Sequence, residues 1–541
     1  MPSLCTGIRL AVLVWTTLFC AACTKQASAP VVAPQSLLSR PHVTLVAVTD
    51  WQATLKPCGC TVELQKGGIE RIAQWLGELR QQDDSVLVVH AGSLLHDGEV
   101  AAAPAAQAQF GLRRQVFAQT LQRLGTAAVA LSGWDLAHGG TETALAYAQA
   151  KWPVLALGAP PAGVAAQSSL LTETKSGVSV GLIGVDGVAG TDDAQRLELV
   201  RVEVAKVRQQ GAQVVVVLSN LGLRGSRRMA RAVTGIDAMV VGQLDERGEP
   251  LRDMEREGDT LLVHAARHGA WMAALTLVPN PAGGGWLQAS EFLPGAAADL
   301  EARQAGLQAQ FDAAQRHATL ATQLAKPFYV EQLTDLQQRL ARAKAAAGQP
   351  VPAGKLAAFR SVGLLWSAPV DDTVAALVKT YDAAAAASAE KLAVQPVPAV
   401  LGQATYIGHG NCLTCHMPTQ AFAMNDAHSK AWQTLEKVGK TRDLDCVPCH
   451  VTAWQLPGGS ALGNLDKFQA VRCEACHGPG SLHAAGPVSG EATRPGMPAL
   501  VAEKCAVCHT AQHSPRFDFA QYRQRLLVPG HGARMLDNKG K

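Results

Sequence analysis

The chain has 541 residues, of which 48% are hydrophobic and 17% are charged, and this is the composition of a globular protein. Its length exceeds that of one ordinary domain, so we expect two or three. The formal net charge is +4 and no basic tract is present, which argues against a nucleic acid or another polyanion as partner.

The first 22 residues predict an export signal. One arginine is followed by an apolar stretch too short to span a membrane as a mature helix, and two alanines stand directly before Cys23. These residues resemble a bacterial lipobox in which Cys20 takes the place of the usual leucine. The resemblance implies that Cys23 becomes the lipid-bearing N-terminus and that residues 23–41, rich in alanine and proline, form a tether. An ordinary signal peptide cleaved nearby is the alternative.

Residues 42–292 alternate short apolar runs with helical patterns. Helical spacing relates Ile69, Ile72, Leu76 and Leu79. The runs that predict strands are rich in valine and leucine and are bounded by turn or helix signals: 43–48, 86–89, 127–131, 154–157, 178–185, 214–218, 239–241 and 261–263. Together they predict a layered α/β domain with a largely buried sheet, in which functional residues follow the carboxyl ends of the strands.

The residues at these strand ends occur in a recognisable order. They are Thr49-Asp50, Gly67-Gly68, Arg71, Ala91-Gly92, Leu136 to Gly139, Leu218 to Gly222 and Val241-Gly242. In this order they resemble the calcineurin-like metallophosphoesterases, and within that family the N-terminal domain of the 5′-nucleotidases.

The metal ligands of that family are largely replaced. Such enzymes hold two metal ions through D-x-H, G-D, G-N-H, S-H and G-H-x-H motifs, of which only the first aspartate, Asp50, is present here. The remaining ligand positions carry Gln52, Ser93, Gly133, Trp134, Asn220, Gln243 and Asp245. Amides, a hydroxyl and an indole do not hold two dications. We therefore expect a retained metallophosphoesterase-like fold whose hydrolase site is lost.

Two further groups in this region have open roles. Cys58 and Cys60 predict an easily reduced disulfide, a soft-metal site or a structural disulfide that holds their loop. Similar Cys-Gly-Cys loops occur in nucleotidase-like lipoproteins with multihaem domains. Three histidines could rebuild a metal site or serve as structural residues: His90, His96 and His138.

Residues 293–392 change in composition to alanine, glutamine, leucine and arginine and predict a helical segment. One helix start is marked by Pro369, Asp371 and Asp372 before an apolar periodic run. Residues 393–404 contain two prolines and predict a linker into the last region, residues 405–541.

Four copies of C-x-x-C-H occupy the last region. In chain order we call them motif 1 (Cys412, Cys415, His416), motif 2 (Cys446, Cys449, His450), motif 3 (Cys473, Cys476, His477) and motif 4 (Cys505, Cys508, His509). Two thiols at this spacing can add to the two vinyl groups of one porphyrin while the next side chain ligates the iron. Disulfides or zinc would not explain why a histidine follows every second cysteine. The motifs predict four covalent haem c groups.

The region also resembles the tetrahaem cytochromes that accept electrons from hydroxylamine oxidoreductase. The residues that carry this resemblance, besides the motifs, are Tyr406, Gly408, His428, Trp432, Pro479, His483, Ser514, Pro515 and Phe517. The resemblance implies a mainly α-helical domain with closely spaced haems, mostly bound by two histidines. Candidate distal ligands are His409, His428, His483, His513 and His531. His428 and His483 match family positions best, and a hydrogen bond near a propionate is the alternative for His409.

These observations favour electron transfer between exported redox partner proteins. Two alternatives remain: a reductase that binds a small substrate at an open haem or at Cys58 and Cys60, and a ligand-binding or partner-binding α/β domain fused to an electron carrier. Attachment of haem c occurs outside the cytoplasmic membrane, in agreement with the export signal. Thr24, by resemblance to bacterial sorting rules, favours lipid anchoring at the outer membrane, on its periplasmic side or at the cell surface.

Overall fold

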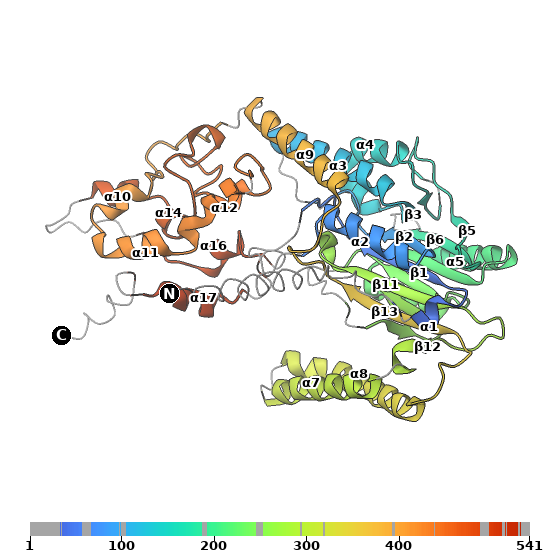
Figure 1. Cartoon of the computed structure of the whole chain (residues 1–541). Coiled ribbons are helices and arrows are strands. Elements are labelled where there is room, and N and C mark those ends of the chain that lie inside the picture. Colours follow the sequence, from blue (N-terminus) through green and yellow to red (C-terminus); the bar gives the residue numbers. More distant parts are fainter. Residues whose placement is uncertain are drawn as a thin grey trace, which may run out of the picture.

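The computed structural model describes most of the chain (Figure 1). The described residues are 33, 35–56, 66–96, 98, 104–158, 160–186, 192–244, 251, 253–292, 295–316, 320–391, 395–437, 439–486, 497–510, 514, 517–528 and 531. The predictions for Cys23, Cys58, Cys60, Asp245 and His513 lie outside these residues.

Two β-sheets form the centre of the larger domain. The first has the order β12-β13-β11-β1-β2-β3-β4 and the second the order β5-β6-β7-β8-β10-β9. The first comprises β1 Val43–Thr49, β2 Val86–Ala91, β3 Thr126–Ala130, β4 Val154–Leu155, β11 Met272–Val278, β12 Leu287–Gln288 and β13 Leu356–Val362. The second comprises β5 Ser169–Glu173, β6 Ser179–Asp186, β7 Val214–Asn220, β8 Ala238–Val241, β9 Glu255–Glu257 and β10 Thr260–Val263. All eight predicted strands are present.

Alternating side chains of the strands face two different cores. On β1, Leu45 and Ala47 pack in the core between the sheets, whereas Val46 and Val48 pack against the helices outside the first sheet. Both faces of the sheet are therefore buried, which explains why the strands are almost wholly apolar. A third core lies between the second sheet and its own helices. The domain thus has four layers, helices outside and two sheets inside, as the α/β prediction required.

Helices cover both outer faces. They are α1 Gln35–Leu38, α2 Ile69–Gln82, α3 Pro104–Arg123, α4 Gly133–Ala148, α5 Asp193–Gln209, α6 Gly222–Ala232 and α9 Asp372–Lys391, with the 3-10 turns η1 Arg267–Gly269 and η2 Ala289–Phe292. The predicted start of α9 is confirmed, because Asp371 accepts the backbone N–H of Val374 at 2.8 Å.

The segment 293–392 differs from its prediction as a wholly helical unit. It does contain the paired helices α7 Ala296–Arg316 and α8 Leu320–Ala346, which project from the domain in Figure 1. However, β13 lies within it and pairs antiparallel with β11 and parallel with β12, inside the first sheet. The run Leu356–Val362 is short and follows a long helical composition, so its place depends on partners about 80 residues earlier in the chain.

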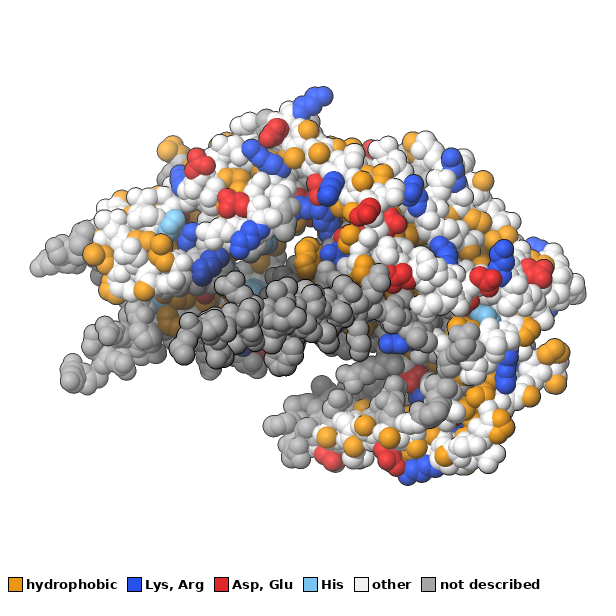
Figure 2. Space-filling view, in the orientation of Figure 1, with side chains coloured by type: hydrophobic (Ala, Val, Ile, Leu, Met, Phe, Trp, Pro, Cys, Tyr) orange, Lys and Arg blue, Asp and Glu red, His pale blue; other side chains and the backbone are white. Residues whose placement is uncertain are grey.

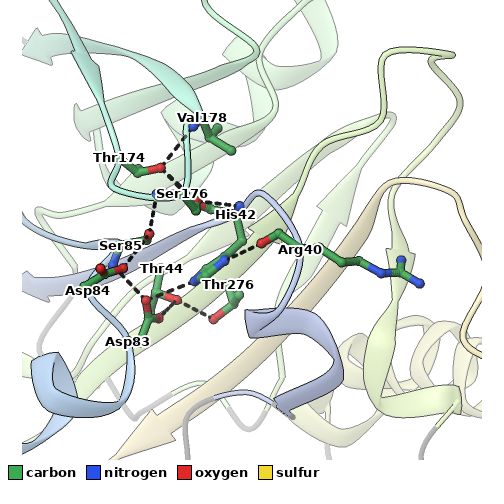
Figure 3. Close-up of polar contacts among 10 residues, drawn as sticks. All are labelled: Arg40, His42, Thr44, Asp83, Asp84, Ser85, Thr174, Ser176, Val178 and Thr276. Atoms are coloured by element: carbon green, nitrogen blue, oxygen red, sulfur yellow. Dashed lines mark hydrogen bonds and ion pairs between the residues drawn. The ribbon is translucent and has the colours of Figure 1, made fainter.

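A buried polar network joins the two sheets where β1 begins (Figure 3). His42 Nε2 lies 2.9 Å from Asp83 Oδ1, and Asp83 Oδ2 accepts the hydroxyl of Thr44 at 2.5 Å. Ser176, in the β5–β6 turn of the second sheet, donates to the backbone oxygen of His42 at 2.6 Å. Burial alone would lower the pKa of His42, but its hydrogen bond to Asp83 raises that pKa. Burial alone would raise the pKa of Asp83, and the bonds from His42 and Thr44 lower it.

The cytochrome-like region lies beside α3 and α9 (Figure 1). Its short elements are α10 His409–Leu413, η3 Met417–Thr419, α11 Gln420–Asn425, η4 His428–Lys430, α12 Ala431–Lys437, α13 Val447–His450, η5 Leu462–Asn464, α14 Cys473–His477, α15 Ser481–Ala485, α16 Ala502–Ala506 and α17 Phe519–Leu526. A small apolar core around Trp432 and Val447 supports them.

The surface is mixed in charge. Figure 2 shows acidic and basic side chains interspersed over the face in view. Across the part of the chain that the structure describes, none of the helices combines the length and the apolar character that a membrane span requires.

Candidate haem-binding site

Each motif lies on or directly beside a short helical turn. In motif 1 the N–H of His416 donates to the backbone oxygen of Cys412 at 2.9 Å, and in motif 4 the N–H of His509 donates to that of Cys505 at 2.8 Å. One helical turn therefore brings the first cysteine and the histidine of a motif close together. All eight motif cysteines are free thiols. They remain available for thioether bonds.

The four motifs do not follow one another in space as they do in the chain. The α10 helix of motif 1 contacts the α14 helix of motif 3, where Cys412 and Cys473 are neighbours. The α14 helix also contacts the α16 helix of motif 4. Cys449 of motif 2 and Cys508 of motif 4 are neighbours. The spatial order is therefore 1-3-4-2.

Three of the proximal histidines face a second histidine. The ring centroids of His416 and His483 are 6.2 Å apart. Those of His509 and His428 are 6.0 Å apart, and those of His477 and His531 are 6.2 Å apart. A metal–nitrogen bond of about 2 Å places the centroids of two imidazoles that share one metal ion about 6 Å apart. The three separations fit an iron between each pair.

Hydrogen bonds at Nδ1 leave Nε2 as the ligand atom in several of these histidines. In His428, Nδ1 lies 3.0 Å from Asp426 Oδ2, and in His531 it lies 2.7 Å from the backbone oxygen of Leu526. In His509, Nδ1 lies 3.0 Å from the hydroxyl of Ser514. Such bonds fix the ring and its tautomer for metal binding.

His450 of motif 2 differs from the other three motif histidines in its ring contacts. Its Nδ1 lies 2.7 Å from the backbone oxygen of Ala431, so its Nε2 is likewise directed to ligation. Within the described part of the chain, however, no second imidazole contacts its ring. His409, the first residue of α10, contacts no described imidazole either; burial and the charge of Arg472 lower its pKa.

Apolar side chains beside the motifs are unusually exposed. Met417 follows motif 1 and is 68% exposed, and Val507 within motif 4 is 74% exposed. Leu482, next to His483, is 50% exposed. Large apolar side chains gathered around ligand histidines are what the faces of a porphyrin would cover. The donor set and its apolar surroundings therefore fit haem c.

Glu474 is a site residue that the sequence analysis missed. It stands between the cysteines of motif 3, is 2% exposed, and accepts the backbone N–H groups of Ile407, Gly408 and Gly480 at 2.7 to 3.1 Å. Its carboxylate thus ties the segment before motif 1 and the turn before His483 to motif 3. The two residues between the cysteines of C-x-x-C-H vary freely, so the motif does not predict a role for them. The acidic character of Glu474 was the only indication in the sequence.

In the α/β domain, the position of the family's metal site is closed by internal hydrogen bonds. Asp50 is buried, and its carboxylate accepts the N–H groups of Ser93, Gln243 and Leu244 at 2.9 to 3.1 Å. Gln52 donates to the Ser93 hydroxyl at 2.9 Å. Burial raises the pKa of Asp50, although these bonds oppose the shift. The one retained acid therefore holds loops together.

The three candidate histidines, His90, His96 and His138, do not converge on one point. His90 is fully buried beside Trp51, and burial lowers its pKa to about 4. His96 and His138 lie together, with ring centroids 6.0 Å apart, and Trp134 stacks on His138. No group of three metal-ligating side chains is present among the described residues. The described geometry therefore favours structural roles for these three histidines over a shared metal site.

Comparison with known proteins relates the two regions to different families. Residues 411–478 match the family model "Cytochrome c554 and c-prime". The curated cytochrome c-554 of Nitrosomonas europaea is 31% identical over 93 residues, which cover 14% of this chain and 40% of that protein. The chain thus spans less than half of the curated relative. The match supports the predicted resemblance of this region to the multihaem cytochromes c.

Solved structures similar to the chain include three enzymes. The 5′-nucleotidase precursor of Thermus thermophilus aligns with a TM-score of 0.41 at 15% identity, over 77% of this chain and 71% of that one. The sulfate thiohydrolase SoxB of the same organism aligns at 0.40 and 12%, over 63% and 60%. The NAD nucleotidase of Haemophilus influenzae aligns at 0.37 and 17%, over 44% and 52%. At this level of likeness no activity is transferred to the chain.

Proposed function

We propose that the chain is an exported tetrahaem cytochrome c that carries electrons between redox partner proteins. The observation that carries the proposal is the set of three imidazole pairs at 6.0 to 6.2 Å, each containing a motif histidine. Two imidazole ligands saturate an iron and favour electron transfer over substrate chemistry. Each bound haem supplies one-electron redox chemistry.

The residues of the chain then have distinct roles. The eight motif cysteines attach four haems, and the four motif histidines are proximal ligands. The distal ligands are His483 for motif 1, His531 for motif 3 and His428 for motif 4, as their ring separations support. The contacts between motifs support an electron path in the order 1-3-4-2 rather than in chain order.

The proposal includes a membrane anchor. The apolar stretch and small residues before Cys23 support a lipid at that cysteine and a position on the periplasmic side or surface of the bacterial outer membrane. The compartment is one in which haem c is attached, so export and cofactor are consistent.

A second candidate function concerns motif 2. A reductase of a small substrate is the alternative function, and it requires an open coordination position on the motif 2 haem. It is favoured by the observation that, among the described residues, no imidazole contacts the ring of His450. Ligation of this haem by His409, or by His513 outside the described residues, would fill that position.

Intact mass and electron spin resonance test both functions. We expect a mass increase of four haems, with at least three of the four irons low-spin. Fewer than four haems would refute the tetrahaem proposal. Four low-spin irons would exclude the open position and, with it, the haem-based reductase.

A further inference from the structure

A buried polar interface joins the α/β domain to the segment that leads into motif 2. The side chain of Gln109, on α3 and 4% exposed, donates to the backbone oxygens of Ala385 on α9 at 2.8 Å and of Arg442 at 2.9 Å. It also accepts the N–H of Leu444 at 2.9 Å. One amide therefore fixes α3, α9 and the residues just before Cys446.

A charge cluster lies at this interface and contains two lysines and two aspartates. Lys56 comes from the α/β domain and binds Asp382 of α9 at 2.5 Å. Lys440 of the cytochrome-like region binds the other oxygen of Asp382 and also Asp443, the latter at 2.7 Å. The side chain of Lys440 is 5% exposed, so its charge is poorly solvated.

This cluster lies next to the first cysteine of motif 2. The N–H of Cys446 donates to the backbone oxygen of Asp443 at 3.0 Å. The Cys446 sulfur is within electrostatic range of two aspartates, Asp443 and Asp445, and of two lysines, Lys440 and Lys56. A positive charge from the α/β domain therefore reaches the attachment point of one haem, the one that lies at an end of the spatial order 1-3-4-2.

We propose that Lys56 raises the reduction potential of the haem attached to Cys446 and Cys449, so that the α/β domain tunes this haem. The inference rests on the proposed tetrahaem function. A nearby positive charge disfavours ferric over ferrous iron, and the effect is large where water does not screen it. By linkage, reduction of the same haem alters the strength of the contact between the two regions.

Redox titration of the full-length holoprotein tests the proposal through substitutions of opposite charge. Lys56→Met is expected to lower the midpoint potential of the motif 2 haem, and Asp382→Asn is expected to raise it. The Lys56 side chain is 35% exposed, so its replacement is compatible with folding. Lys56→Arg keeps the charge and is expected to retain the wild-type potential.

Controls assign the shift to this haem and to this charge. The motif 2 haem is identified as the titration that disappears in Cys446→Ala/Cys449→Ala. Lys206→Met removes an exposed lysine that pairs with Glu203 on α5, remote from the cytochrome-like region in Figure 1, and is expected to shift no midpoint. Unchanged midpoints, or shifts of the same sign in Lys56→Met and Asp382→Asn, would overturn the inference. A mass with fewer than four haems would instead refute the proposed function.

Discussion

Replacement of Asp50 by alanine distinguishes a structural carboxylate from a retained metal ligand. Its carboxylate accepts the buried backbone N–H of Ser93, the partly buried backbone N–H groups of Gln243 and Leu244, and the Ser93 hydroxyl at 3.2 Å. An unsatisfied buried donor costs about 1 to 3 kcal/mol. With partial relaxation of the loops, we expect Asp50→Ala to lower the free energy of unfolding by about 3 to 5 kcal/mol.

Urea unfolding of the α/β domain within the full chain, followed by far-ultraviolet circular dichroism, measures this loss. The matched control is Glu198→Ala on α5, which removes an exposed carboxylate paired with Arg201 at 3.1 Å. An exposed pair contributes about 0.5 kcal/mol, so the control should unfold almost as the wild type does.

Unchanged or raised stability of the Asp50→Ala variant would indicate a metal ligand. A metal-binding acid is held in place at a cost to stability, and its removal is commonly neutral or stabilising when no metal is bound. If Asp50→Ala leaves stability unchanged or raises it, and if added manganese stabilises the wild type but not the variant, the hydrogen-bonded interpretation is wrong and the domain retains a metal site.

Four other substitutions test the remaining assignments. His428→Ala and His483→Ala should each convert one low-spin iron to high spin in the spin-resonance spectrum; an unchanged spectrum would contradict that ligand. Cys23→Ala should release the protein from membranes in fractionation, and continued membrane association would contradict lipid anchoring there. His42→Asn should destabilise the chain more at pH 5 than at pH 9 in urea unfolding. Ionised Asp83 stabilises above about pH 3.9 and protonated His42 below about pH 6.5, and the His42 contribution is lost as pH rises through its raised pKa. Equal losses at both pH values would contradict the ion pair.

Local patterns predicted the fold better than the pairing of distant elements. The buried valine-rich runs identified eight strands, because each run carries its own signal. β5, β11 and β13 were not predicted. β11 is a fully buried apolar run whose local signal the sequence analysis overlooked, whereas β13 gains its place from β11 and β12, far away in the chain. β9 and β12 have three and two residues, too few for any periodicity.

The candidate haem-binding site likewise contains residues that the local sequence identifies and residues that only the tertiary fold identifies. C-x-x-C-H identifies attachment cysteines and proximal histidines from adjacent residues. The partner of each histidine depends on the tertiary fold: His428, which follows motif 1 in the chain, faces His509 of motif 4. The spatial order 1-3-4-2 likewise depends on contacts between remote segments, and Glu474 gains its role only from the backbone groups folded around it.

The internal hydrogen bonds of Asp50 give the α/β domain a structural role. Because Asp50 is saturated by backbone donors, the loops at the strand ends need no metal ions to stay ordered. The first sheet can then hold α3 and α9 in fixed positions. Those two helices supply Gln109 and Asp382 to the interface beside Cys446. A domain whose loops are held by internal hydrogen bonds is therefore able to hold fixed charges near the proposed haem of motif 2, and that role requires rigidity but no hydrolytic chemistry.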